Sequence, residues 1–507
     1  MGLFGGAKKP KVLFVATEAK PFASVGGLGA VMYSLPKALR KIGYDARVMI
    51  PRYLPIEDTH ELPIRMEYEG LEVPTGNHEG EQYMRCNVKR YDSDEEPGKP
   101  VTTYFLENME YYEQRANIYG YADDPVRWAL LCRGVLEFLR MSQWRPDVII
   151  CADWQTGYLP NYLKTVYAHD RRLSGITTIF SIHNLVYQGM FNHRFVKESE
   201  YDDGHSPIPA FNDPRLLQIN GLRRGIMNAD VINTVSPTYA KEIMTEEFGE
   251  GLETLLAERR SAVYGILNGI DYKLWDPEHD PLLEHPFSQR EVDKRAPNKA
   301  LLQQRFGLPV RDDAFVAAIV SRLTQQKGLD LVEEAIEPLL QELPMQLIVL
   351  GEGEDKYMRF FQELQKKFPE QVSTELKFDP AMPHQVFAGA DAVLVPSLFE
   401  PCGLTQMEAM RYGAIPIVRK TGGLADTVVD ATASEEGTGF VFEKYMSASL
   451  LVAVVRAYEN FRNKDFWKQL QQRAMGKNFS WEMSARKYDK MIEKALKARE
   501  THAGAQE

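Results

Sequence analysis

The stretch KVLFVATEAKPFASVGGLGAV, from Lys11 to Val31, joins a short apolar run to two glycines and then to a pattern with helical spacing. A buried strand, a glycine turn and a helix in this order predict the opening of an α/β domain. At the start of such a helix, Gly26 and Gly27 would let a phosphate group approach the bare backbone. A tight turn without a ligand is the alternative, because the full G-x-G-x-x-G spacing is absent.

Short apolar runs rich in valine and isoleucine recur between helical patterns along the rest of the chain. They are ARVMIP, DVIICADW, TTIFSIHN and DVINTVSP in the first half, and AFVAAIVSRL, QLIVLGEGE, DAVLVPS, IPIVRK and GFVFE in the second. Continuous apolar strands between helices are what a parallel sheet covered on both faces requires. Because 507 residues exceed the size of a single core, the sequence predicts an α/β fold of two doubly wound domains.

Composition marks the expected domain boundaries. Residues 276–300 are polar, contain proline and carry no strand signal, which is typical of a connection between domains. From Ser480, apolar residues at helical spacing predict an amphipathic helix docked on the body, with a frayed end at 501–507. The sequence therefore predicts an N-terminal domain at 1–267, a junction at 268–299, a C-terminal domain at 300–479, and a closing helix and tail at 480–507.

Charge and cysteine usage exclude several classes of protein. A formal net charge of −11 argues against a nucleic-acid-binding surface, which needs a basic field. The four cysteines form no C-x-x-C pair and are expected to be free thiols of a reducing compartment. No secretory leader is recognised, and no apolar run approaches the roughly 20 residues that span a bilayer. We therefore expect a cytoplasmic protein that binds neither nucleic acid nor a membrane.

Polar residues follow several predicted strands, where ligands of open α/β sheets bind. Arg322 and Lys327 lie five residues apart after a strand and can face one diphosphate, although a solvated loop is the alternative. In PSLFEPCGLTQMEAMRYG, Glu400 falls in a turn and Glu408 falls two helical turns later, so the pair can accept hydrogen bonds from sugar hydroxyls. For Glu408, a favourable interaction with the helix dipole explains the residue equally well.

Further candidates lie in similar positions. RKTGGLADTV places Thr421, Gly422 and Gly423 between a strand and a helix, which repeats the pattern of the opening stretch. In SIHNLVYQGMF, His183 comes at a strand end, where a donor or acceptor contact is more plausible than for an isolated histidine. Asp153 and Asn268 also follow strands, and turn chemistry alone would explain them.

These motifs together resemble a known family. FASVGGLGAV, CADWQT, SIHNLVYQG, INTVSPTYAKEI, GILNGIDYKLWDPEHDP, VSRLTQQKGLDL, PSLFEPCGLTQMEAMRYG and TGGLADTV occur in the order seen in bacterial glycogen synthases and plant starch synthases. The resemblance runs from about Lys11 to Tyr488. It implies the GT-B architecture, two Rossmann-like domains facing across a deep cleft. It also implies transfer of glucose from ADP-glucose or UDP-glucose to the non-reducing end of an α-1,4-glucan, with retention of configuration and without a metal, and ADP-glucose is the expected donor.

Residue roles follow from the resemblance position by position. Arg322 and Lys327 would hold the donor diphosphate, Glu400 the donor glucose and Glu408 the ribose. The remaining matched positions would meet the donor or the sugar, with His183 nearest the reacting carbon: Asp153, His183, Asn268, Thr421, Gly422, Gly423, Gly26 and Gly27. We expect His183, Arg322, Lys327, Glu400 and Asp153 to carry the catalysis.

The chain departs from the family pattern at three positions. Ser24 stands where the family usually has a lysine near the donor phosphates, Ala30 where it has an aspartate, and Ala152 where it has a histidine. One phosphate-binding cation is therefore missing from the N-terminal half. Two alternatives to an active glucan synthase follow: a glucan-binding homologue that has lost catalysis, and a GT-B transferase acting on a small acceptor.

Overall fold

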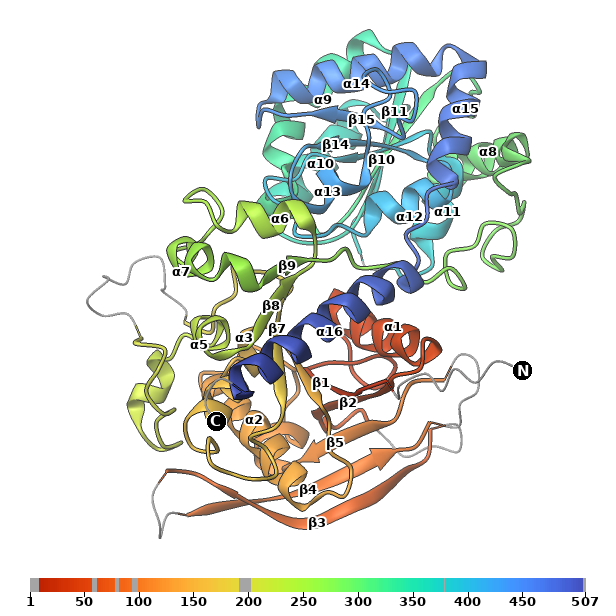
Figure 1. Cartoon of the computed structure of the whole chain (residues 1–507). Helices are drawn as coiled ribbons and strands as arrows, with labels where there is room; N and C mark the ends of the chain where they lie inside the picture. The colour runs from red at the N-terminus through yellow and green to blue at the C-terminus, as the bar shows by residue number, and fades with distance from the viewer. Residues whose placement is uncertain are drawn as a thin grey trace. The chain divides into compact units, whose positions relative to one another are not determined.

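The computed structural model describes residues 9–56, 62–77, 82–93, 99–190, 202–377 and 379–504. The chain forms two compact units, which are described separately (Figure 1). The first unit comprises Met1–Val235, Ala240–Ile266 and Trp481–Glu507, and the second comprises Ser236–Tyr239 and Leu267–Ser480. Residues 268–299, expected to be a junction, thus belong to the second unit.

The first unit contains a nine-stranded sheet in the order β3-β4-β5-β2-β1-β6-β7-β8-β9. Its neighbouring strands are parallel, except that β4 runs antiparallel to both β3 and β5. The strands are β1 (Lys11–Val15), β2 (Asp45–Pro51), β3 (Ile64–Pro74), β4 (Tyr83–Tyr91), β5 (Thr103–Glu107), β6 (Val148–Ala152), β7 (Thr177–Ile182), β8 (Val231–Thr234) and β9 (Val263–Gly265). The apolar runs of the first half correspond to β1, β2, β6, β7 and β8.

The ribbon of β3 and β4 at the outer edge of this sheet is an addition to the predicted fold (Figure 1). Most residues of β3 are exposed or half-buried, so the strand lacks the continuous apolar run of a buried parallel strand. The connection at Tyr91–Pro100 joins the antiparallel strands β4 and β5, and residues 94–98 of it lie outside the described residues.

Helices pack around the buried strands of the first unit, and those strands are apolar on both faces for this reason. The main helices are α1 (Gly27–Lys41), α2 (Asp124–Met141), α3 (Asp153–Thr156), α4 (Tyr158–Lys164), α5 (Gly221–Asn228), α7 (Glu253–Glu258) and α16 (Trp481–Gly504). Short helices are η1 (Met109–Glu113), η4 (Pro214–Gln218) and η5 (Arg260–Ala262), and α6 (Pro237–Glu242) is divided between the units after Tyr239.

The closing helix α16 packs against α1 and β7 within the first unit. Asp489 on this helix accepts hydrogen bonds from Lys9 Nζ and Tyr44 Oη, each at 2.6 Å. Tyr488 Oη accepts from Asn233 Nδ2 at 2.9 Å. The helix extends to Gly504, into the segment expected to be frayed, and residues 505–507 lie outside the described residues.

The second unit contains a six-stranded, fully parallel sheet in the order β12-β11-β10-β13-β14-β15. Its strands are β10 (Phe315–Val320), β11 (Met345–Leu350), β12 (Val372–Glu375), β13 (Ala392–Val395), β14 (Ile415–Arg419) and β15 (Phe440–Phe442). Its helices are η6 (Val292–Arg295), α8 (Ala296–Arg305), η7 (Gln325–Lys327), α9 (Leu329–Glu342), α10 (Asp355–Lys367), α11 (Met382–Gly389), α12 (Thr405–Arg411), α13 (Gly422–Thr427), α14 (Ser447–Phe461) and α15 (Lys464–Met475). This strand order is that of a Rossmann fold.

The segment 268–299 is packed onto the second unit through a buried polar cluster. Asp280 Oδ2 accepts hydrogen bonds from Tyr412 Oη at 2.5 Å and from His384 Nδ1 at 2.6 Å. The indole of Trp275 stacks on the His384 ring, with centroids 4.0 Å apart. Because these contacts are buried, this stretch of polar sequence is an ordered part of the unit.

Candidate functional site

The parallel part of each sheet has one point at which the chain reverses the direction in which strands are added, and ligands of α/β folds bind beyond the carboxyl ends of the strands there. In the first unit this point lies between β1 and β6, which are neighbours in the sheet. In the second it lies between β10 and β13. The predicted site residues Asp153, Lys327 and Glu400 lie in segments that directly follow β6, β10 and β13, respectively.

In the first unit, Asp153 binds the loop that carries His183. Asp153 Oδ1 accepts a hydrogen bond from the backbone N–H of His183 at 2.7 Å and from that of Asn184 at 3.4 Å. Asp153 has a φ of 59°, in the left-handed region where asparagine and aspartate are the non-glycine residues best tolerated. The structure therefore brings together these two predicted residues, with Asp153 positioning the His183 loop.

Burial dominates the acid–base behaviour of this pair. It lowers the pKa of the His183 imidazole, although the charge of Asp153 opposes the change. Burial also raises the pKa of Asp153, against the effects of His183 and the two amide groups. Ser181 Oγ lies 3.2 Å from His183 Nε2 and is its hydrogen-bond partner. The imidazole is therefore neutral at neutral pH and can act as a hydrogen-bonding group toward a sugar.

The glycine turn before α1 binds a carboxylate of its own chain. Glu18 Oε2 accepts hydrogen bonds from the backbone N–H groups of Val25 at 2.6 Å and Gly26 at 3.1 Å. Glu18 is not among the site residues predicted from the sequence. The available signal was its place, as an acidic residue between a buried strand and a glycine turn. The N–H of Gly26, expected to face a donor, thus has an intramolecular partner.

In the second unit, Lys327 and Glu400 form a largely buried ion pair, with Lys327 Nζ 2.7 Å from Glu400 Oε2. Ser397 Oγ donates to the same oxygen at 2.9 Å. Gly328 has a φ of 70°, and a Cβ there would overlap the carbonyl oxygen of Pro396, so only glycine allows this close approach of the two loops. A cavity of about 40 Å³ lies beside the ion pair and is also lined by Gly403 and Gln406.

Arg322 lies in the same loop as Lys327, and its side chain is exposed. Glu408 lies on α12 and is half-buried. These two predicted residues come from the segments after β10 and β13, at the same end of the sheet as the ion pair. The predicted diphosphate-binding and sugar-binding residues of this unit therefore share one region.

The glycines before and within the first turn of α13 allow two chain segments to meet. A Cβ on Gly422 would overlap the carbonyl oxygen of Glu400, and a Cβ on Gly423 would overlap that of Cys402. The Gly423 N–H donates to the Glu400 carbonyl at 3.0 Å. Thr421, directly before α13, is fully buried. Close packing of the backbone accounts for glycine at these two positions.

Asn268 belongs to the second unit and lies beside Cys402. Its Oδ1 is buried and accepts no hydrogen bond from any described residue. Burial raises the pKa of the Cys402 thiol to about 12, despite a backbone hydrogen bond from Asn268 that opposes this. The thiol is therefore protonated and is not a nucleophile at neutral pH.

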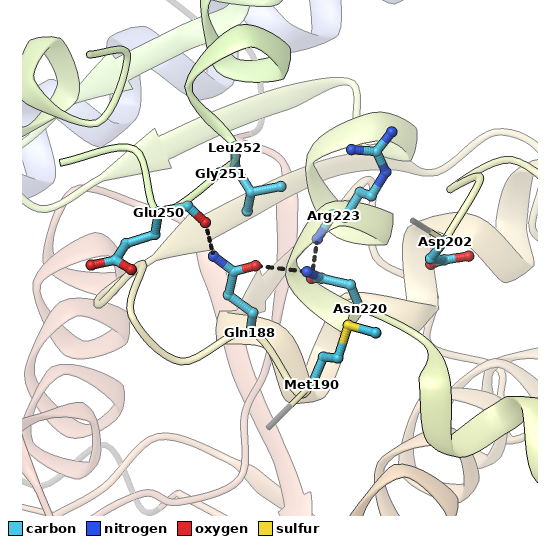
Figure 2. Close-up of a pocket in the computed structure, with 8 residues that line it drawn as sticks. All are labelled: Gln188, Met190, Asp202, Asn220, Arg223, Glu250, Gly251 and Leu252. Carbon is cyan, nitrogen blue, oxygen red and sulfur yellow. Dashed lines mark hydrogen bonds between the residues drawn. The ribbon is translucent and has the colours of Figure 1, made fainter. Parts of the chain in front are cut away.

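The first unit also contains a cavity, of about 20 Å³. It is lined by Gln188, Met190, Asp202, Asn220, Arg223, Glu250, Gly251 and Leu252 (Figure 2). Gln188 is its central residue: its Nε2 donates to the Glu250 carbonyl at 3.0 Å, and its Oε1 accepts from Asn220 Nδ2 at 2.6 Å. Such a volume holds about one water molecule. The network fixes the end of the His183 loop, and no predicted site residue lines it.

The chain is similar to known proteins over nearly its whole length. Residues 11–258 match the starch synthase catalytic domain family, and residues 302–474 match the glycosyl transferases group 1 family. The chain is 41% identical to a glycogen synthase of Geotalea daltonii over 494 residues, which cover 96% of this chain and 99% of that protein. The chain belongs to the glycogen synthase family. A glycogen synthase of Geobacillus stearothermophilus is likewise 41% identical, over 97% of this chain and 99% of its own length.

Solved structures of this fold include members of the same family. The catalytic domain of starch synthase IV from Arabidopsis thaliana, bound to ADP and acarbose, is 30% identical, with a TM-score of 0.82 over 96% of this chain and 99% of that one. Sucrose-phosphate synthase from Thermosynechococcus elongatus shares only the fold, at 17% identity and a TM-score of 0.55 over 97% of this chain and 100% of its own. The predicted GT-B fold class and the glycogen and starch synthase function of a glucosyltransferase are confirmed.

No group of three or more histidine, cysteine, aspartate or glutamate side chains in the described ranges is arranged to hold a metal ion. None of the described helices is long and apolar enough to cross a membrane.

Proposed function

We propose that this glycogen synthase transfers glucose from ADP-glucose to the non-reducing end of an α-1,4-glucan, with retention of configuration. The observation that carries the proposal is the Lys327–Glu400 pair at the reversal point of the second sheet, a cation and a carboxylate where a nucleotide sugar is expected to bind. The ADP and acarbose bound to the starch synthase IV structure support ADP-glucose as the donor and a glucan as the acceptor.

In this proposal, Lys327 keeps its bond to Glu400 while it binds a donor phosphate. An ammonium group has three donors, and the hydrogen bond to Glu400 uses one of them. Arg322, exposed in the same loop, adds a planar guanidinium that can bind two phosphate oxygens. Together these cations would stabilise the negative charge that develops on the leaving diphosphate, an effect that is usually the largest in such reactions.

Glu400 would accept hydrogen bonds from the donor glucose. Lys327 and Ser397 both bind its Oε2, and no hydrogen bond to its Oε1 is formed by the described residues. This oxygen is free to accept from a sugar hydroxyl. Glu408 would bind the ribose. The segment from Thr421 to Gly423 would support the loop that carries Glu400, through the hydrogen bond to the Glu400 carbonyl.

The first unit would contribute the neutral imidazole of His183, positioned by Asp153, to the glucose ring. Asn268 of the second unit would present its buried Oδ1 to a sugar hydroxyl or an ordered water. We propose a cytoplasmic location, which the four free cysteines of the chain support.

The test is release of nucleoside diphosphate from ADP-glucose and from UDP-glucose, each with and without a maltooligosaccharide primer. We expect primer-dependent release that is faster with ADP-glucose, and NMR of the product should show a new α-linkage. Arg322→Ala should lower the rate about 100-fold, whereas Arg462→Ala, which removes an exposed arginine paired with Glu459, should not change it. Faster release with UDP-glucose would contradict the proposed donor.

A binding homologue without catalysis is the second candidate, because Ser24, Ala30 and Ala152 replace the residues usual in the family. It predicts that the folded protein binds the maltooligosaccharide primer but releases no diphosphate from either donor. Glucosylation of a small metabolite without lengthening of the primer would instead identify a small-acceptor transferase.

A further inference from the structure

The side chain of Glu18 is a buried carboxylate whose two oxygens both bind groups of the first unit. It directly follows β1, and 3% of the residue is exposed. Oε2 accepts from the N–H groups of Val25 and Gly26, and Oε1 accepts from Tyr119 Oη at 3.0 Å. Tyr119 Oη also lies 2.7 Å from Thr17 Oγ1, which orients the phenol. Amide and phenol donors, without a basic side chain, thus satisfy the buried charge.

The two amides belong to the glycine turn directly before α1, where backbone N–H groups can bind an anion. Backbone N–H groups in a glycine turn at a helix N-terminus attract phosphate or carboxylate. Gly26 is the N-cap of α1 and has no side chain to cap the helix. Its carbonyl oxygen accepts a hydrogen bond from Ser24 Oγ at 3.3 Å, and its N–H donates to Glu18. The chain therefore supplies the anion itself.

The charge of Glu18 also acts on the other residues at this end of the sheet. Burial raises the pKa of Asp153 and lowers that of His183, and the negative charge of Glu18 then favours the protonated form of both groups. Glu18 and Asp153 follow the neighbouring strands β1 and β6 and use the same arrangement: one carboxylate oxygen accepts from two consecutive backbone amides. Two carboxylates beside a neutral imidazole disfavour a phosphate and suit hydroxyl donors.

We propose that Glu18 is a positioning residue that occupies the anion site of the glycine turn, holds this turn in place after β1, and makes this part of the first unit selective for sugar hydroxyls over phosphate. The consequence for catalysis rests on the proposed glucosyl transfer. Binding of the Glu18 carboxylate to the turn amides does not rest on that proposal, and it can be measured separately.

The first measurement is hydrogen exchange of the Val25 and Gly26 amides, followed by mass spectrometry of peptides from residues 22–31. Glu18→Ala should speed their exchange about 100-fold, and Glu18→Gln about 10-fold, because a neutral acceptor is weaker than a charged one. Added formate should restore slow exchange in Glu18→Ala by filling the vacated carboxylate position. Wild-type exchange in either variant would overturn the proposal, whether or not the protein has transferase activity.

The second measurement is primer-dependent transfer by the same variants. We expect kcat/KM to fall about 100-fold in Glu18→Ala and about 10-fold in Glu18→Gln, with formate restoring Glu18→Ala at least about 10-fold. Glu137→Ala is the matched control, because Glu137 is also a buried carboxylate that accepts from a tyrosine, Tyr167 Oη, at 2.5 Å. Formate should not change the activity of that control.

Other results with the Glu18 variants also test its positioning role. A Glu18→Ala protein that folds, loses activity and shows no response to formate would overturn the positioning role, since a merely destabilised fold would behave in this way. If Glu18→Ala does not fold, Glu18→Gln decides by its exchange rate. In another outcome, the variants show the expected faster hydrogen exchange while the wild-type protein transfers no glucose. That result would contradict the proposed function and still support the role of Glu18 in the turn.

Discussion

The two units use carboxylates in different ways at equivalent points of their sheets. In the first unit, Glu18 and Asp153 each bind two backbone amides, and the loop that Asp153 binds carries the neutral imidazole of His183. In the second, Glu400 pairs with the ammonium group of Lys327. The fold supplies the same location twice, and the side chains decide whether that location is suited to hydroxyl groups or to phosphates.

The difference also changes what each carboxylate contributes to stability. An amide-bound carboxylate shapes its loop, so its loss frees backbone that other residues depend on. A carboxylate in a buried ion pair depends on its cation, so the loss of Lys327 would leave Glu400 buried and uncompensated.

Lys327→Ala should have the largest effect. Loss of the cation removes a phosphate contact and leaves the Glu400 charge buried, so kcat/KM should fall about 1000-fold and the free energy of unfolding by about 3 kcal/mol. Steady-state kinetics and denaturant unfolding measure the two. Lys420→Ala is the control, because Lys420 pairs with Glu443 on the exposed surface of the same unit. Near-wild-type activity in folded Lys327→Ala would show that the second unit does not work through this cation.

Asp153→Ala should lower kcat/KM about 100-fold, because the His183 loop loses its hydrogen-bond acceptor and alanine is strained at a φ of 59°. Asp153→Asn should stay within about 10-fold of wild type, since its carbonyl oxygen can still accept from the amide. Asp147→Ala is a matched control: Asp147 accepts from the Lys11 N–H at 2.7 Å, at the opposite end of the same strands. Equal losses in Asp153→Ala and Asp147→Ala would contradict a local role.

The protonation of His183 should make stability fall in mild acid. Because burial lowers its pKa in the folded state, this group stabilises the fold above the unfolded pKa of about 6.5. The contribution is lost as the pH falls through the folded pKa. Asp153, with a raised pKa, acts in the opposite direction. Thermal unfolding of wild type and His183→Gln between pH 5 and 7.5 should therefore differ less as the pH falls, and a difference independent of pH would contradict the neutral imidazole.

Ser24→Lys should have the smallest effect. Ser24 is exposed beside a turn whose Gly26 amide already binds the buried carboxylate of Glu18, so an added ammonium would stay on the solvent-exposed side of the turn. An exposed ion pair contributes up to about 1 kcal/mol, or about 5-fold in an equilibrium constant. KM for the nucleotide sugar should change by no more than this. A decrease of about 100-fold would mean that the turn binds the donor phosphates and that the two units share this task.

Local features of the chain could be predicted from its sequence, whereas contacts between distant segments could not. The apolar runs predicted the buried strands, and the motifs after them predicted where Lys327 and Glu400 lie. The β3–β4 ribbon was missed because a half-exposed antiparallel strand has no continuous apolar run. The role of Gly422 could not be chosen from sequence, since its close contact is with the Glu400 carbonyl, 22 positions earlier in the chain.

Glu18 shows most clearly why part of the site could not be predicted. Its hydrogen bonds reach across a tight turn to Val25 and Gly26, and across about a hundred positions to Tyr119. From the sequence, an acidic residue near a glycine turn is as consistent with a solvent-exposed loop as with an internal anion. Only its burial distinguishes the two.

The sequence by itself determined the alternation of buried strands and helices, the family, and the identity of the charged residues after the strands, because periodicity and motif order are local properties of the chain. The tertiary structure decided which partner each of those charges has. Glu18 and Asp153 bind backbone amides and Glu400 binds Lys327 because the strand order brings particular loops together at the carboxyl ends of each sheet. Partner choice depends on this packing, which joins segments that are distant in the sequence.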